Sequence, residues 1–283
     1  MEIKKRNNLF LLGNILGLNT RSLVATPTTS GTHYPKLKPF ILNHKKEIAK
    51  ANSKIQKQLQ SENKILIIYA CHTNNYLKWN SFAKNFGYLI QVPNSDLVII
   101  NSSELKQAHT LQSSYKSKCK EFILIPNNKL LDFGKWRYGL EKIDYSNYKY
   151  ITFINDSILI EGPINFYFNL LRSKNFDLYG YNNSTQTRFH IQTYLFSIKV
   201  AKINKFIDFI DKNKNKVKDS QESVIMNYEI RLTDVYPNHK NFINTREFPD
   251  HKGKNIFFNN DYLYQNLKQN GLFPFTKIKR MHV

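Results

Sequence analysis

The sequence predicts an α/β fold in which helices cover a mostly parallel, Rossmann-type sheet. Four short segments are rich in Ile, Leu, Val and Phe, which is typical of strands buried on both faces: 64–70, 96–101, 121–126 and 150–155. Segments whose apolar residues have helical spacing separate and follow these strands. Strands that alternate with helices in this way favour a parallel sheet with helical crossovers.

The remaining elements follow in chain order. Helices are predicted where apolar residues recur every three or four positions, which is the case over 75–86, 132–143, 164–171, 202–213, 221–230 and 261–269. Asp132 stands at the start of the second of these segments, where a carboxylate can cap the first turn. Two further strands are predicted over 177–181 and 191–200.

The N-terminal part of the chain differs in composition from the rest. It holds a loop-like segment, Thr26–Gly31, and a polar helical pattern over 40–60, so we predict an irregular helical extension over 1–60 and a main domain over 61–283. The apolar segment Leu9–Leu18 is too short to span a bilayer, and no small-residue cleavage site follows it closely. We interpret it as an amphipathic or docking segment, which leaves peripheral membrane association as an open alternative.

Composition narrows the class of protein. An apolar share of 41% and an aromatic share of 14% exclude global disorder. The 42 basic and 21 acidic residues give a net charge of +21, which favours polyanions, anionic membrane surfaces or phosphate-bearing substrates. The two cysteines, Cys71 and Cys119, exclude a disulfide framework and favour a reducing compartment, so we expect a cytoplasmic protein.

The residues that follow each predicted strand are the first candidates for a binding site, because ligands of parallel sheets sit beyond the carboxyl ends of the strands. These segments are 71–73, 101–103, 127–128, 155–157 and 182–183. The most informative is Asn155-Asp156-Ser157, since a carboxylate at the end of a buried strand can hold Mg²⁺ or Mn²⁺ that bridges a diphosphate. The alternative is ordinary turn chemistry, with Asp156 capping the next segment.

Several motifs along the chain occur in an order typical of a known family. They are Asp132-Phe-Gly-Lys-Trp136, Asn155-Asp-Ser157 with Gly162-Pro163, and His190-Ile-Gln-Thr-Tyr-Leu-Phe196. Over about residues 64–280 the chain resembles the rhamnan synthesis protein F family of glycosyltransferases. It departs from that family at Thr193, where Ser is usual, and Asp156 has no second acid of an Asp-x-Asp beside it.

The resemblance implies a GT-A-like fold and a transferase. Such an enzyme moves a sugar, rhamnose or another deoxysugar being one option, from a nucleotide-sugar donor to a glycan or polysaccharide acceptor. The resemblance also implies a divalent cation, Mn²⁺ or Mg²⁺, as cofactor. Asp156 is the first candidate both for catalysis and for holding the ion, and His251 is a second candidate for a metal contact.

Transfer with inversion of the anomeric carbon needs a carboxylate that deprotonates the acceptor hydroxyl. Glu222 and Glu229 are the candidates, because seven residues on a helix bring two side chains to nearly the same face; their alternative is a solvated charge. Candidates for binding the donor or acceptor are His72, Asp132, Trp136, Asn155, Ser157, His190 and Gln192. The alternatives are a helix cap for Asp132 and a core position for Trp136.

Two other functions stay open on the sequence alone. The missing second acid favours a degenerate transferase fold that binds glycan without turnover. The net charge and the basic run Lys212–Lys218 favour a nucleic-acid-binding protein, but no recognised nucleic-acid module accompanies the run. We therefore expect no specific nucleic-acid partner.

Overall fold

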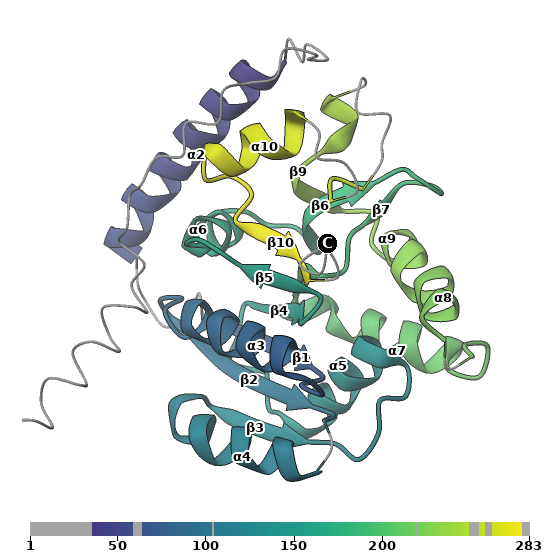
Figure 1. Cartoon of the computed structure of the whole chain (residues 1–283). Coiled ribbons are helices and arrows are strands. Elements are labelled where there is room, and N and C mark those ends of the chain that lie inside the picture. The colour runs from purple at the N-terminus through teal and green to yellow at the C-terminus, as the bar shows by residue number, and fades with distance from the viewer. Residues whose placement is uncertain are drawn as a thin grey trace, which may run out of the picture. The chain divides into compact units, whose positions relative to one another are not determined.

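A curled eight-stranded sheet forms the centre of the computed structural model, which describes residues 36–58, 64–103, 105–218, 220–248, 255–257 and 262–278 (Figure 1). Its main path runs β3 (Glu121–Leu124), β2 (Ser95–Asn101), β1 (Ile65–Cys71), β4 (Tyr150–Asn155), β8 (Leu195–Lys199), β6 (Leu178–Ser184) and β7 (His190–Ile191). β9 (His239–Ile243) pairs with β6 outside this path.

The first four strands run parallel in the order 3-2-1-4, and β8 is antiparallel to both of its neighbours. Every residue of β1 and β4 is buried, as their continuous apolar runs predict. The predicted fold class, a mostly parallel Rossmann-type sheet flanked by helices, is confirmed by this order. Two short strands, β5 (Ile158–Ile160) and β10 (Phe275–Lys277), form a separate antiparallel sheet.

Helices lie on both faces of the sheet (Figure 1). They are α3 (Tyr76–Leu89), α4 (Leu105–Tyr115), α5 (Leu131–Lys142), α6 (Asn165–Ser173), α7 (Ile203–Asn213), α9 (Ile230–Val235) and α10 (Tyr262–Gln269). Odd positions of β1, such as Ile65, pack in one core with α3 and α6, and even positions, such as Leu66, pack in a second core with α5 and α7. The two cores follow from the alternation of side chains along a strand.

Some predicted boundaries are wrong for identifiable reasons. The predicted strand 191–200 is divided into β7 and β8, and the predicted helix 221–230 is α8 (Gln221–Val224) followed by a π-helical turn (Ile225–Glu229) and α9. The sequence did not predict α4, whose segment has few apolar residues, or the short strands β5, β9 and β10. Short 3-10 turns cover Lys116–Lys118, Val200–Lys202 and Thr245–Glu247.

The polar helix predicted near residue 40 is α2 (Leu37–Gln58). Its residues Leu37, Phe40 and Ala51 are buried in the same core as α3 and α6. The Nε2 atom of His44 lies 2.8 Å from the carbonyl oxygen of Phe242 in β9, which is a further contact with the main body. The domain boundary at residue 60 stays a prediction. Among the described helices, none combines the length and apolar character that crossing a bilayer requires.

Candidate active site

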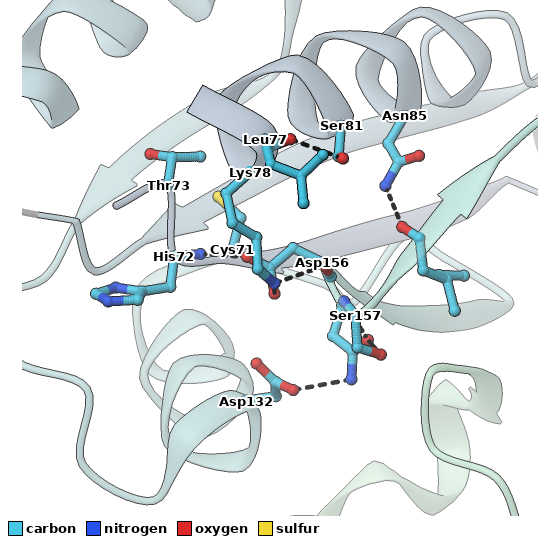
Figure 2. Close-up of polar contacts among 12 residues, drawn as sticks. Cys71, His72, Thr73, Leu77, Lys78, Ser81, Asn85, Asp132, Asp156 and Ser157 are labelled. Atoms are coloured by element: carbon cyan, nitrogen blue, oxygen red, sulfur yellow. Dashed lines mark hydrogen bonds and ion pairs between the residues drawn. The ribbon is translucent and has the colours of Figure 1, made fainter. Parts of the chain in front are cut away.

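Asp156 follows β4 and joins three elements at the carboxyl end of the sheet. Its Oδ2 atom accepts a 2.8 Å hydrogen bond from the backbone N–H of His72, and its Oδ1 atom lies 3.0 Å from Nζ of Lys78 on α3. The same Nζ donates to the backbone carbonyl of Asp156 at 2.8 Å (Figure 2). One carboxylate oxygen therefore has its partner in the residue that follows β1, and the other has its partner in α3.

The start of α3 explains why Lys78 reaches this carboxylate. Asn75 caps the helix, and its side chain accepts from the backbone N–H of Lys78 at 2.9 Å, which places Lys78 in the first turn beside the strand ends. Farther along the helix, Asn85 donates to the carbonyl of Ile158 at 2.8 Å and accepts from the N–H of Ile160 at 2.7 Å. Helix α3 is thus fixed both to Asp156 and to β5, the strand that follows it.

The side chain of Asn155 is turned toward Asp132, and that of Ser157 is turned toward Asn155. The amide of Asn155 donates to Oδ2 of Asp132 at 2.8 Å, and its Oδ1 accepts from the Ser157 hydroxyl at 2.6 Å. The Ser157 oxygen in turn accepts from Nζ of Lys277 at 2.9 Å. Asp132 lies in the first turn of α5, but Leu130 and not Asp132 is the cap residue, so the expected helix-capping role is wrong.

The electrostatic surroundings of Asp132 combine burial with opposing charges. Burial raises the pKa of this carboxyl from its ordinary value, and the negative charge of Asp156 acts in the same direction. Nζ of Lys135, which is 3.7 Å away and almost wholly buried, opposes the shift, as does the hydrogen bond from Asn155. Because the net shift is upward, the site disfavours the charged form of Asp132 compared with a carboxyl in water.

A cavity of about 450 Å³ opens beyond these strand ends, where ligands of open α/β sheets bind. Residues with hydroxyl, amide or carboxylate side chains outnumber the apolar residues in its lining, although apolar atoms make up most of the lining surface. The polar members are Asp132, Asn155, Ser157, Ser184, Gln186, Thr187, His190, Gln192, Thr193, Gln221, Glu229, Asn255 and Lys277. Six of the predicted binding or catalytic residues are thus brought together: Asp132, Asn155, Ser157, His190, Gln192 and Glu229.

Glu229 is oriented by a hydrogen-bond network in the wall of this cavity. The Thr193 hydroxyl donates to its Oε2 at 2.6 Å, and the Gln192 amide donates to its Oε1 at 3.2 Å. The same amide nitrogen lies 2.8 Å from Nε2 of His190, whose Nδ1 lies 2.8 Å from the carbonyl oxygen of Arg188. Because a carbonyl only accepts, the proton is assigned to Nδ1, and Nε2 of the neutral ring accepts from Gln192. His190 therefore positions Gln192, which positions Glu229.

Glu229 is the last residue of the π-helical turn Ile225–Glu229. A π turn holds an extra residue, so it changes the face on which every later side chain lies. Glu222 is exposed and is not among the residues that line the cavity, whereas Glu229 is. The predicted shared face of the two carboxylates is wrong, because the helix between them is not regular.

Other predicted site residues lie elsewhere. Trp136 is fully buried and packs against Phe133, Phe153 and Phe196, so the predicted ligand contact is wrong and the residue belongs to the core. The ring of His72 lies next to Ser102, with Nδ1 3.2 Å from its hydroxyl, outside the cavity lining. His251 lies outside the described residues.

The carboxylate that the sequence assigned to a divalent cation does not fit one. Asp156 is mostly buried, with 9% of its side chain exposed, and the ammonium group of Lys78 already occupies the position next to Oδ1. In the part of the chain that the structure describes, no three His, Cys, Asp or Glu side chains are grouped so as to hold a metal ion. The requirement for a cation stays a prediction that these residues do not support.

Sequence reasoning missed the two lysines at the site. Lys78 lies three residues after an Asn that caps a helix, which is a readable signal for its place in the first turn but not for its contact with Asp156. Lys277 ends a three-residue strand 120 positions after the serine to which it donates. Because both contacts join distant parts of the chain, no local pattern shows them.

Comparison with known proteins gives distant similarities. No protein-family model matches the chain. The virulence protein VirA of Vibrio anguillarum is 28% identical over 137 residues, which are 46% of this chain and 43% of VirA, so the match spans less than half of that relative.

Two solved structures are similar at low identity. The apo-form glycosyltransferase GlyE of Streptococcus pneumoniae has 10% identity and a TM-score of 0.44, with 76% of this chain and 54% of GlyE covered. The 4-diphosphocytidyl-2C-methyl-D-erythritol synthase of Anaerococcus prevotii has 10% identity and a TM-score of 0.42, with 66% of this chain and 88% of that one covered. These similarities assign no family, so function has to be argued from the site.

Proposed function

We propose that this chain is a glycosyltransferase that moves a sugar from a nucleotide-sugar donor to a hydroxyl group of a glycan acceptor. The observation that carries the proposal is the Glu229 carboxylate, which hydrogen bonds from Thr193 and Gln192 hold at the wall of the cavity. The cavity volume of about 450 Å³ suits a small organic ligand. Its many hydroxyl and amide side chains suit the hydroxyl groups of a sugar.

In this reaction Glu229 is the base. Its carboxylate, with 22% of the side chain exposed, accepts the proton of the acceptor hydroxyl. The acceptor oxygen forms a bond to the anomeric carbon of the donor, and the bond from that carbon to the phosphate oxygen breaks. The electron pair of the broken bond leaves with the nucleoside diphosphate. Thr193 donates to one carboxylate oxygen and Gln192 to the other. Each oxygen keeps a further lone pair that can accept from the acceptor hydroxyl.

A second group of polar residues in the cavity lining suits the donor. Asp132, Asn155 and Ser157 form a connected set of one carboxylate, one amide and one hydroxyl, which can bind ribose or sugar hydroxyls. Rhamnose or another deoxysugar as the transferred group rests on the motif resemblance alone. A polysaccharide acceptor, a cytoplasmic location and peripheral membrane association likewise stay predictions.

The proposal is tested with the purified chain and a panel of nucleotide sugars that includes dTDP-rhamnose, UDP-glucose and GDP-mannose. Release of nucleotide and transfer to oligosaccharide acceptors are measured in EDTA and in Mn²⁺. A donor that is consumed by the native chain should be turned over about 10²- to 10⁴-fold more slowly by Glu229→Gln, because general-base catalysis contributes that factor. Glu222→Gln, an exposed glutamate seven residues earlier, is the matched control and should keep the native rate.

Three results would count against the proposal. If no donor releases nucleotide under either condition, the chain is not a transferase for these sugars. Donor binding without turnover would favour the glycan-binding alternative that the missing second acid suggests. A Glu229→Gln variant with native turnover would show that another group is the base.

A further inference from the structure

Asn255 lies in the wall of the cavity, although no motif in the sequence pointed to it. Its amide nitrogen donates to Oε1 of Gln192, and the amide nitrogen of Gln192 donates to Oε1 of Glu229 at 3.2 Å. We propose that Asn255 is a positioning residue, which fixes the Gln192 amide in the orientation that donates to the Glu229 carboxylate. This inference rests on the proposed function for the role of Glu229 as the base.

A backbone group sets the direction of these hydrogen bonds. The N–H of Phe257 donates to Oδ1 of Asn255 at 3.1 Å. Because a backbone N–H only donates, Oδ1 has to face it, and the NH₂ group of Asn255 is then the end that faces Gln192. Phe257 is itself buried, and its ring packs against Tyr194 and Phe273 with centroid distances of 5.1 Å. The orientation of Asn255 is therefore anchored in the core.

The other end of the Gln192 amide meets only acceptors. Its nitrogen lies 2.8 Å from Nε2 of His190 and 3.2 Å from Oε1 of Glu229. If the amide were reversed, its oxygen would face these two acceptors and its NH₂ group would face the NH₂ group of Asn255. Gln192 is buried, so water would not replace the lost hydrogen bonds. Asn255 on one side and His190 on the other thus select the same orientation.

This orientation matters for the proton transfer. A reversed amide would set a carbonyl oxygen against the Glu229 carboxylate in place of a donor, and the repulsion would turn the base away from its position at the cavity. A base works only within hydrogen-bond reach of the proton that it accepts. Since Asn255 acts on the base, its loss should lower kcat more than it raises KM.

The test compares two substitutions of Asn255 in a donor-consuming assay. Asn255→Asp keeps the size of the side chain but replaces its donor with an acceptor, so Gln192 should reverse and kcat should fall about tenfold or more, the effect of one lost hydrogen bond to a charged group. Asn255→Ala removes the donor without adding an acceptor and should lose less. A merely structural role would make the truncation the more harmful change. Asn215→Asp adds the same charge at an exposed position and should keep the native kcat.

A second measurement needs no substrate. In urea-induced unfolding, Asn255→Asp and Glu229→Gln should together lower the midpoint by less than the sum of their separate effects, because a glutamine at position 229 can donate to the reversed amide oxygen. This coupling should vanish when Gln192 is replaced by Met, since the two positions then lose the amide that joins them. If Asn255→Asp does not fold, Asn255→Ala carries the test: its loss of kcat should disappear in the Gln192→Met background.

The proposal is overturned if Asn255→Ala lowers kcat as much as Asn255→Asp, if the coupling in unfolding is absent, or if it persists with Gln192→Met, which would show direct repulsion between the two carboxylates. These outcomes are distinct from failure of the proposed function. Native turnover by Glu229→Gln, or no turnover of any donor, would reject the base or the transferase while the coupling in unfolding still reports on Asn255. Slow turnover by Glu229→Gln without that coupling would keep the base and reject Asn255.

Discussion

Replacing Lys78 by Met should destabilise the fold, because the change leaves the Asp156 carboxylate without its ammonium partner. Met keeps most of the length of the side chain and removes only the charge and its hydrogen bonds. Removing one partner of a buried ion pair costs about 3–5 kcal/mol. Since 24% of the Lys78 side chain and 9% of the Asp156 side chain are exposed, water replaces part of the lost contact, and we expect a loss of about 2–3 kcal/mol.

The measurement is urea-induced unfolding followed by the fluorescence of the two tryptophans, Trp79 and Trp136. A loss of this size corresponds to a fall in Tm of about 3–5 °C for a chain of this length. The double variant Lys78→Met/Asp156→Asn has no uncompensated charge, so it should be more stable than Lys78→Met alone, by about 1 kcal/mol or more. A double variant whose loss equals the sum of the two single losses would refute the reasoning, because it would show that the two groups do not interact.

Three further predictions concern regions away from the cavity. Burial alone would raise the pKa of Asp96, but hydrogen bonds from Lys64 and Tyr148 lower it. Asp96→Asn should therefore lower the free energy of unfolding by about 1–2 kcal/mol at pH 7. This difference from the native chain should vanish as the pH falls below about 4, through the lowered pKa, because the Asp96 carboxylate becomes protonated. Gly87→Ala should stabilise the chain by about 0.5–1 kcal/mol in urea unfolding, because its added Cβ meets no atom within 4 Å in α3; a loss would mean strain there. Burial raises the pKa of the Cys119 thiol to about 11, so iodoacetamide at pH 8 should alkylate it about 100-fold more slowly than free cysteine; equal rates would contradict the burial.

The rule that ligands bind beyond the carboxyl ends of parallel strands accounts for most of what the sequence predicted well. Asn155, Ser157 and Asp132 do meet at the carboxyl edge of the sheet, because each follows or nearly follows a strand whose apolar run is easy to recognise. The direction of a side chain is a different matter. Asp156 stands between two residues that line the cavity, yet its own carboxylate is turned to the opposite side, toward α3.

The errors have physical causes that no local pattern carries. The spacing of Glu222 and Glu229 assumed a regular helix, but the π turn that ends at Glu229 changes the phase. Trp136 belongs to a motif that suggested a ligand contact, whereas its helical spacing with Leu140 indicated the core, which is where it lies. Periodicity was the better guide for Trp136, because it reports burial directly.

Lys78 connects the stability of the fold with the question of the metal ion. If its ammonium group excludes a divalent cation from Asp156, then Lys78→Met should open a carboxylate to Mn²⁺ that the native chain keeps closed. An ion that binds only the folded state adds stability that grows with its concentration. Mn²⁺ should therefore restore part of the stability that Lys78→Met loses and leave the native chain unchanged. Equal stabilisation of both proteins by Mn²⁺ would mean that the ion binds elsewhere, and that Lys78 stabilises the fold without deciding the chemistry of the site.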